Sequence, residues 1–180
     1  MTHQLAQVNI ARLLQPLDHE QLADFVANLA PVNADAEAAP GYVWRLKDDV
    51  TDDATSIEAF RWDTADSYGV IVNMSVWVDL QHLLDFVYDP THREVLKRRR
   101  EWFHQVREAT TACWWVPAGH QPTPAEAEDR VLHLRSHGPT PYAFTLREHF
   151  PPPSEGEAHP PVSVPGSRES DERDGLAQLC

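Results

Sequence analysis

Two polar residues interrupt one apolar helical stripe, and both have side chains suited to proton transfer or to charge stabilisation. His92 precedes Val95 and Leu96 by three and four residues, and Arg99 lies between Leu96 and Trp102. On a helix this spacing directs both side chains towards the apolar face. Histidine exchanges a proton near neutral pH, and arginine can stabilise an enolate or phenolate oxygen. The alternative is that Arg99 extends along the edge of the stripe and His92 lies near an exposed helix start.

Two asparagines interrupt segments whose alternation predicts strands. Asn73 lies within residues 70–78, where every second residue is apolar, and Asn9 lies within residues 5–13. A carboxamide can orient a substrate carbonyl, so both residues are candidates for a binding site. The alternative is that they form hydrogen bonds across a dimer interface on the face opposite the helices, away from His92.

Aromatic side chains would supply the walls of a pocket between sheet and helices. The catalytic candidates are therefore His92, Arg99 and Asn73. The candidates for binding a substrate are Asn9, Trp44, Tyr88, Trp102 and Trp115. Trp102 also fits an ordinary core position.

No motif predicts a metal, nucleotide or covalent site. His133 and His137 are four residues apart on a predicted helix, a spacing that suits a shared metal but also a solvated helix end. Cys113 lies in an apolar strand, which favours an inert thiol. We expect no cofactor. Haem is the alternative, with His92 and His120 as the best-placed ligands, although no haem-attachment motif is present.

The composition excludes several partners. The 180 residues carry 15 Lys and Arg against 28 Asp and Glu, a net charge of −13, which argues against nucleic acid and against an anionic membrane surface. No apolar run reaches transmembrane length, and the start of the sequence lacks a signal-peptide pattern. With two cysteines and no disulfide framework, we expect a cytoplasmic protein.

The order of predicted elements indicates an α+β fold of the ferredoxin-like βαββαβ type with an antiparallel sheet. Residues 1–150 would form this domain, with an extra helix from Thr123 and a last edge strand at 142–150. Residues 151–180 are rich in Pro, Ser and acidic residues and predict a disordered tail. With helices on one face, the face that carries Trp77 would need a cover, and a second copy is the natural one.

A resemblance follows from blocks spread along the chain. The segments QVNIARL, PGYVWRL, VNMSVWVDLQHLLDFVY, HREVLKRRREWF and WWVPAGHQPTPAEAEDRVLHLRSHGPTPYAFTLREHF resemble the bacterial family known as domain of unknown function 3291, over residues 4–150. The resemblance implies a dimeric α+β barrel. Relatives of that superfamily include antibiotic-biosynthesis monooxygenases, which oxidise polycyclic aromatic substrates without a metal or flavin.

The function expected from these observations is that of a homodimeric small-molecule enzyme of the antibiotic-biosynthesis monooxygenase type. It would act on an apolar or aromatic metabolite of secondary metabolism, in a pocket between sheet and helices. A cyclase or isomerase using the same pocket, and a non-catalytic dimer that binds a small ligand, are the alternatives.

Overall fold

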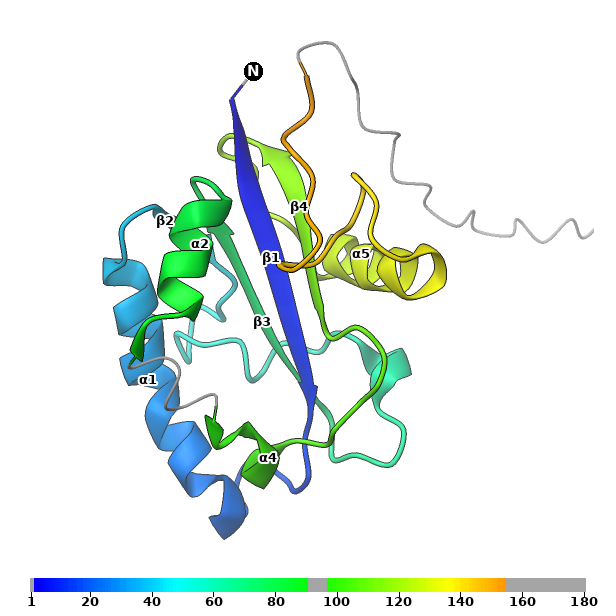
Figure 1. The fold of residues 1–180 in the computed structure, drawn as a ribbon. Helices are drawn as coiled ribbons and strands as arrows, with labels where there is room; N and C mark the ends of the chain where they lie inside the picture. Colours follow the sequence, from blue (N-terminus) through cyan, green and yellow to red (C-terminus); the bar gives the residue numbers. More distant parts are fainter. Residues whose placement is uncertain (1, 91–96, 155–180) are drawn as a thin grey trace, which may run out of the picture.

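The structure is a computed structural model that describes residues 2–90 and 97–154. Its sheet contains four strands in the order β2-β3-β1-β4, and every neighbouring pair is antiparallel (Figure 1). The strands are β1 (His3–Arg12), β2 (Tyr42–Arg45), β3 (Val70–Trp77) and β4 (Thr111–Pro117). This order and this pairing confirm the predicted ferredoxin-like fold.

Helices and short helical turns connect the strands. Helix α1 (Ala23–Ala38) follows a 3₁₀ turn, η1 (Glu20–Leu22), and a second turn, η2 (Arg61–Asp63), precedes β3. Helices α2 (Leu80–Val87) and α4 (Arg99–Trp102) come before β4, and α5 (Pro124–His137) follows it. No helix in the described part of the chain is long and apolar enough to cross a membrane.

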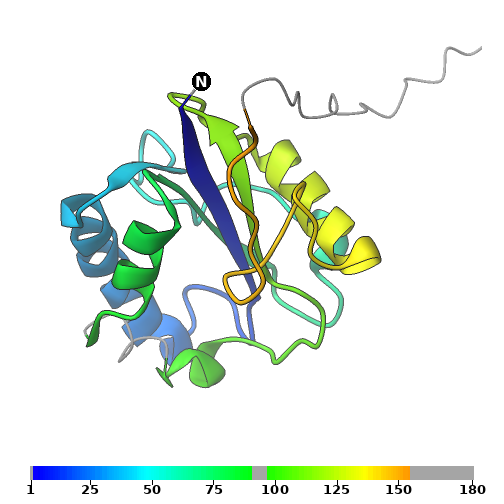
Figure 2. The same cartoon turned by 45° about the horizontal axis from the view of Figure 1, so that its top comes forward.

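Elements of the same chain cover both faces of the sheet. The β3 side chains Val72, Met74 and Val76 pack with α5 and with Phe60 of the segment before β3. The opposite face, which carries Asn73, is turned towards α1, α2 and α4. Figure 2 shows α1 and α2 on one side of the sheet and α5 on the other. The expectation that the face carrying Trp77 lies opposite the helices was therefore wrong, because Trp77 packs with Leu83 and Phe86 of α2. Association of two chains stays a prediction.

Helix α1 continues through Pro31, where the sequence predicts a kink or an end. Proline lacks an amide hydrogen, so the helix forgoes one internal hydrogen bond at that turn. None of the 16 residues of α1 is buried. Its inward side chains, Phe25, Leu29 and Val32, are only half-buried because a cavity separates this helix from the sheet.

Helix α5 begins and ends as its sequence predicts. The Thr123 hydroxyl accepts a hydrogen bond from the amide of Glu126, and Pro124 occupies the first turn. The helix ends at Gly138, whose φ of 73° is readily adopted only by glycine. These caps place the buried side chains of Val131 and Leu134 against the sheet.

Two predicted elements are shorter in the structure. The segment 142–150 does not form an edge strand. Phe144 forms an isolated antiparallel bridge with Cys113, in which the two residues exchange two backbone hydrogen bonds, and Ala143 forms another with Thr140. Burial raises the pKa of the Cys113 thiol to about 12, as expected for an unreactive thiol. The spacing of Trp102, Phe103 and Val106 predicts a helix that reaches Val106, but α4 ends at Trp102, because Phe103 is already extended. The predicted tail lies outside the described residues except for 151–154.

Candidate ligand cavity

A cavity of about 530 Å³ lies between the Asn73 face of the sheet and the helices α1, α2 and α4. This volume falls within the range of roughly 300–1,000 Å³ that small-molecule sites occupy. Polar side chains from β1, β3 and β4 line the sheet side: Gln7, Asn9, Asn73, Ser75 and Thr111. Apolar and aromatic side chains line the rest: Phe25, Leu29, Val32, Trp77, Phe86, Trp102 and Phe103.

Two asparagines form the centre of the polar floor. Asn9 on β1 and Asn73 on β3 are direct partners in the antiparallel register, so their side chains project from the same face. Both are exposed although they lie in the two central strands, which means that the cavity gives them access to water. The Asn9 amide donates to the Thr111 hydroxyl over 2.8 Å. The Asn73 amide nitrogen has no acceptor within the described ranges and is available to a ligand.

A second pair of polar residues continues the floor towards α2. The Gln7 amide donates to the Ser75 hydroxyl over 3.1 Å, and the indole N–H of Trp77 donates to the same oxygen over 2.9 Å. These bonds fix the Trp77 ring, which stacks on Phe86 at 5.1 Å between ring centroids. Along β3 the floor thus changes from the polar side chains of Asn73 and Ser75 to the aromatic ring of Trp77.

The aromatic wall near α4 is held by contacts among three rings. Phe25 of α1 lies 5.7 Å from Trp102 and 5.0 Å from Phe103, measured between centroids. Trp102 is fully buried against Leu13 and Leu22. The wall therefore joins the start of α1 to the end of α4, and its half-buried rings, Phe25 and Phe103, offer apolar surface to a ring-shaped ligand.

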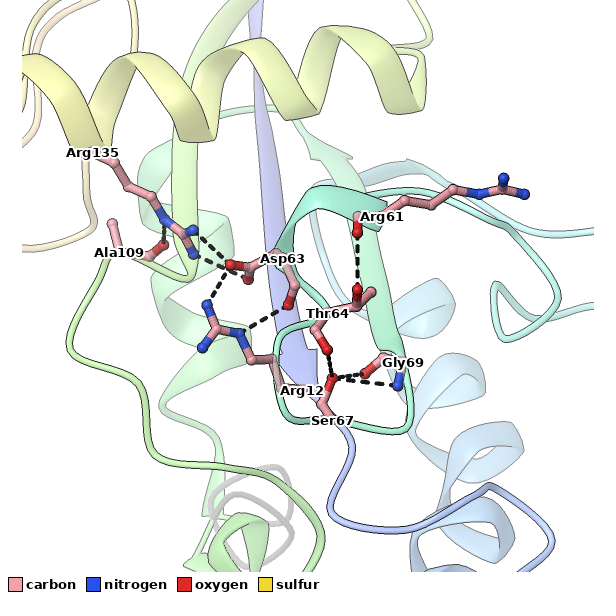
Figure 3. Close-up of polar contacts among 8 residues, drawn as sticks. All are labelled: Arg12, Arg61, Asp63, Thr64, Ser67, Gly69, Ala109 and Arg135. Atoms are coloured by element: carbon pink, nitrogen blue, oxygen red, sulfur yellow. Dashed lines mark hydrogen bonds and ion pairs between the residues drawn. The ribbon is translucent and has the colours of Figure 1, made fainter.

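A buried carboxylate anchors the segment before β3 beside the cavity. The Asp63 carboxylate accepts hydrogen bonds from Arg12 of β1 at 2.5 Å and from Arg135 of α5 at 2.8 Å (Figure 3). Arg135 also donates to the backbone oxygen of Ala109 over 2.9 Å. Burial alone would raise the pKa of Asp63, but the bonds from Arg135 and Arg12 outweigh it and lower the pKa below its ordinary value. Arg12 lines the cavity, so this network also fixes part of the cavity edge.

The structure brings four of the eight predicted site residues to the cavity and leaves three elsewhere. Asn9, Asn73, Arg99 and Trp102 line it. Contrary to the alternative that the asparagines face away from the helices, both are turned towards α1 and α2. The eighth residue, His92, lies outside the described residues and stays a sequence prediction.

Trp44, Tyr88 and Trp115 do not line the cavity, for three different reasons. A bulge between Tyr42 and Trp44 shifts the register of β2, so Trp44 packs on the opposite, apolar face. Tyr88 ends α2 and is exposed. Trp115 projects from the cavity face, but it is covered by the chain after α5, and its indole N–H donates to the Phe150 oxygen over 2.7 Å.

Three of the four histidines considered as metal or haem ligands, His120, His133 and His137, have other partners. His120 is paired with Glu126 at 2.8 Å, away from the cavity. His133 is bonded to the Thr140 hydroxyl and stacks on His137. Within residues 2–90 and 97–154 there is no group of three or more side chains placed to hold a metal ion.

Sequence reasoning missed several lining residues. Gln7 and Ser75 share the strand face of the two asparagines, and the alternation of β1 and β3 carries that signal. His104, whose imidazole supplies a titratable group at the cavity, follows the end of α4 and belongs to no periodic pattern.

The comparisons with known proteins identify a family. No curated protein matches the chain. Its structure is similar to the crystal structure of SnoaB, a cofactor-independent oxygenase from Streptomyces nogalater, with 17% identity, coverage of 67% of this chain and 97% of that chain, and a TM-score of 0.39. It is also similar to the NE2512 protein of unknown function from Nitrosomonas europaea, with 14% identity, coverage of 68% and 96%, and a TM-score of 0.39. The family model described as Domain of unknown function (DUF3291) matches residues 4–159, and the chain therefore belongs to that family.

Proposed function

We propose that this chain is a cytoplasmic small-molecule enzyme of the antibiotic-biosynthesis monooxygenase type, which oxidises an aromatic metabolite of secondary metabolism without a cofactor. The observation that carries the proposal is the cavity of about 530 Å³ with aromatic walls and a polar floor on which the Asn73 amide nitrogen is available to a ligand. Such a cavity suits a flat, ring-containing molecule that bears carbonyl or hydroxyl oxygens.

The chemistry would start from an electron-rich ring. Loss of a proton turns a phenol or an enolisable ketone into an anion that can pass electrons to molecular oxygen. In the overall reaction a ring CH₂ becomes C=O, one oxygen atom enters the product and the other leaves as water. The protein would stabilise the anion and accept the proton.

The residues for these two roles lie around the cavity. The Asn73 amide nitrogen would donate to the oxygen on which negative charge develops, as donors do in oxyanion holes. His104 lines the cavity and would accept the proton, a role for which His92 also stays a candidate. Arg99 lines the cavity too, and would add positive charge near the anion.

Binding without catalysis is the second candidate, and one observation favours it. The polar groups of the floor are neutral amides and hydroxyls, and several bond to one another, as Asn9 does to Thr111 and Gln7 to Ser75. A cyclase or isomerase would use the same cavity with a single proton-transfer group. Association of two chains stays a prediction that native mass spectrometry checks.

Incubation of the protein with each member of a panel of polycyclic phenols and anthrones, in the presence of oxygen, tests the proposal. We expect oxygen consumption in a closed cell and a product that has gained one oxygen atom and lost two hydrogens. A product of unchanged mass would indicate an isomerase or a cyclase, and binding without turnover would indicate the second candidate; either result would contradict the monooxygenase proposal.

Two variants of α1 locate the reaction in the cavity. Leu29→Trp fills the cavity from the helix side, and we expect it to reduce binding and turnover at least about tenfold, as steric exclusion from a close-packed site requires. Val26→Trp adds the same ring on the exposed side of α1 and serves as the control. Equal behaviour of the two variants would contradict the placement of the site.

A further inference from the structure

The charge of the cavity differs from that of the whole chain. The chain has 15 basic residues, Lys and Arg together, against 28 acidic residues. The described residues that line the cavity include four arginines and one carboxylate, Asp53. An acidic protein with a basic cavity attracts negatively charged molecules to that cavity and repels them elsewhere.

Two of the four arginines are already neutralised by the protein. Arg45 is buried and pairs with Glu37 at 2.7 Å and with Asp52 at 3.0 Å. Arg12 pairs with Asp63 at 2.5 Å. These two side chains hold the fold together through carboxylates of the chain itself, so we do not assign them to the ligand.

The other two arginines carry free charge. Arg99 and Arg100 are consecutive residues of α4, both line the cavity, and both are exposed, which places them at its opening. Within the part of the chain that the structure describes, neither forms an ion pair. Their neighbour Arg98, by contrast, is paired with Asp24 at 2.7 Å and with Glu101 at 2.8 Å.

We propose that the ligand of this cavity is an aromatic carboxylic acid, whose carboxylate is held by Arg99 and Arg100 at the opening. The inference rests on the proposed function, because it specifies the substrate of the same site. The planar guanidinium group matches a carboxylate with two parallel hydrogen bonds. The rings of the acid would lie on the half-buried rings of Phe25 and Phe103, and its ring oxygens would face Asn73.

A matched pair of probes tests this charge preference. Anthraquinone-2-carboxylate and anthraquinone-2-carboxamide have the same ring and nearly the same shape, and only the first is an anion. We expect calorimetric titration of the full chain to show about tenfold tighter binding of the acid at low salt. The preference should shrink in 1 M salt, where charges are screened beyond about 3 Å.

Two double variants with the same change in net charge complete the test. Arg99→Gln with Arg100→Gln should abolish the preference for the acid, so that acid and amide bind with equal affinity. Arg107→Gln with Arg147→Gln alters exposed arginines that do not line the cavity and should preserve the preference. The inference is overturned if acid and amide bind equally to the native chain, or if the preference survives in the first double variant. Absence of binding by both probes would instead overturn the proposed site itself.

Discussion

Asp63→Asn is expected to lower the free energy of unfolding by about 3 kcal/mol. Asp63 is buried, and its carboxylate forms ion pairs with both Arg12 and Arg135. Removing one partner of a buried ion pair costs roughly 3–5 kcal/mol because the remaining charge stays buried without compensation. We place the loss at the lower end because the arginine side chains retain 20% and 14% exposure to water. Urea-induced unfolding, monitored by tryptophan fluorescence, measures this loss in the free energy of unfolding.

Asp66→Asn is the matched control for this variant. It removes the same charge from the same segment at an exposed position, and asparagine tolerates the positive φ of 55° found there. We expect a change within about 0.5 kcal/mol. A similar, small effect of both substitutions would show that the network around Asp63 does not hold the segment on the sheet.

The same network gives stability a defined pH dependence. The pKa of Asp63 is lowered in the folded state, so the folded protein binds a proton there less readily than the unfolded chain. The stabilisation is therefore complete above the ordinary carboxyl pKa of about 3.9 and is lost as the pH falls below it through the lowered folded-state pKa. The native chain should lose stability in that acidic range more steeply than Asp63→Asn does.

Asn73→Ala is expected to reduce turnover by about 100- to 1,000-fold, the loss that follows removal of one donor to a developing oxyanion. The fold should persist, because the Asn73 side chain is exposed to the cavity and accepts only one long hydrogen bond, at 3.5 Å from Gln7. Steady-state kinetics with the best substrate of the phenol and anthrone panel measures the effect.

Gln81→Ala provides the comparison for Asn73→Ala. Its amide lies on the exposed side of α2 and donates to Asp85 over 2.7 Å. Turnover should be unchanged in this variant. If Asn73→Ala retained native turnover while the Leu29→Trp variant lost it, the cavity would be the site but Asn73 would have no part in the reaction.

Local sequence signals predicted much of the fold. The strand alternation around Asn73 gave the right two faces, and the Thr123 and Gly138 caps gave both ends of α5. The alternation of polar and apolar residues did not predict which helices cover each face of the sheet. Polar residues in mid-strand ordinarily face water, and here they face a cavity beneath a helix with no buried residue.

The missed and misplaced site residues have equally specific causes. A bulge in β2 places Tyr42 and Trp44 on opposite faces of the sheet. The sequence of a four-residue strand does not reveal such a one-residue register shift. Trp115 is on the predicted face, but the cover contributed by Phe150 comes from a distant segment without periodicity. The role of Asp63 as a partner of two arginines depends on contacts 51 and 72 residues apart, which the sequence alone does not reveal.

The most direct measurement is a ¹H–¹⁵N NMR titration of the native chain that follows the side-chain amides of Gln7, Asn9 and Asn73. With anthraquinone-2-carboxylate as the probe, we expect the Asn73 amide signals to shift most and those of Asn9 and Gln7 to follow. The amide of Gln81 outside the cavity should stay unchanged. If the floor amides did not move under saturating probe, or if shifts were confined to residues outside the cavity, the account of this cavity as the ligand site would be contradicted.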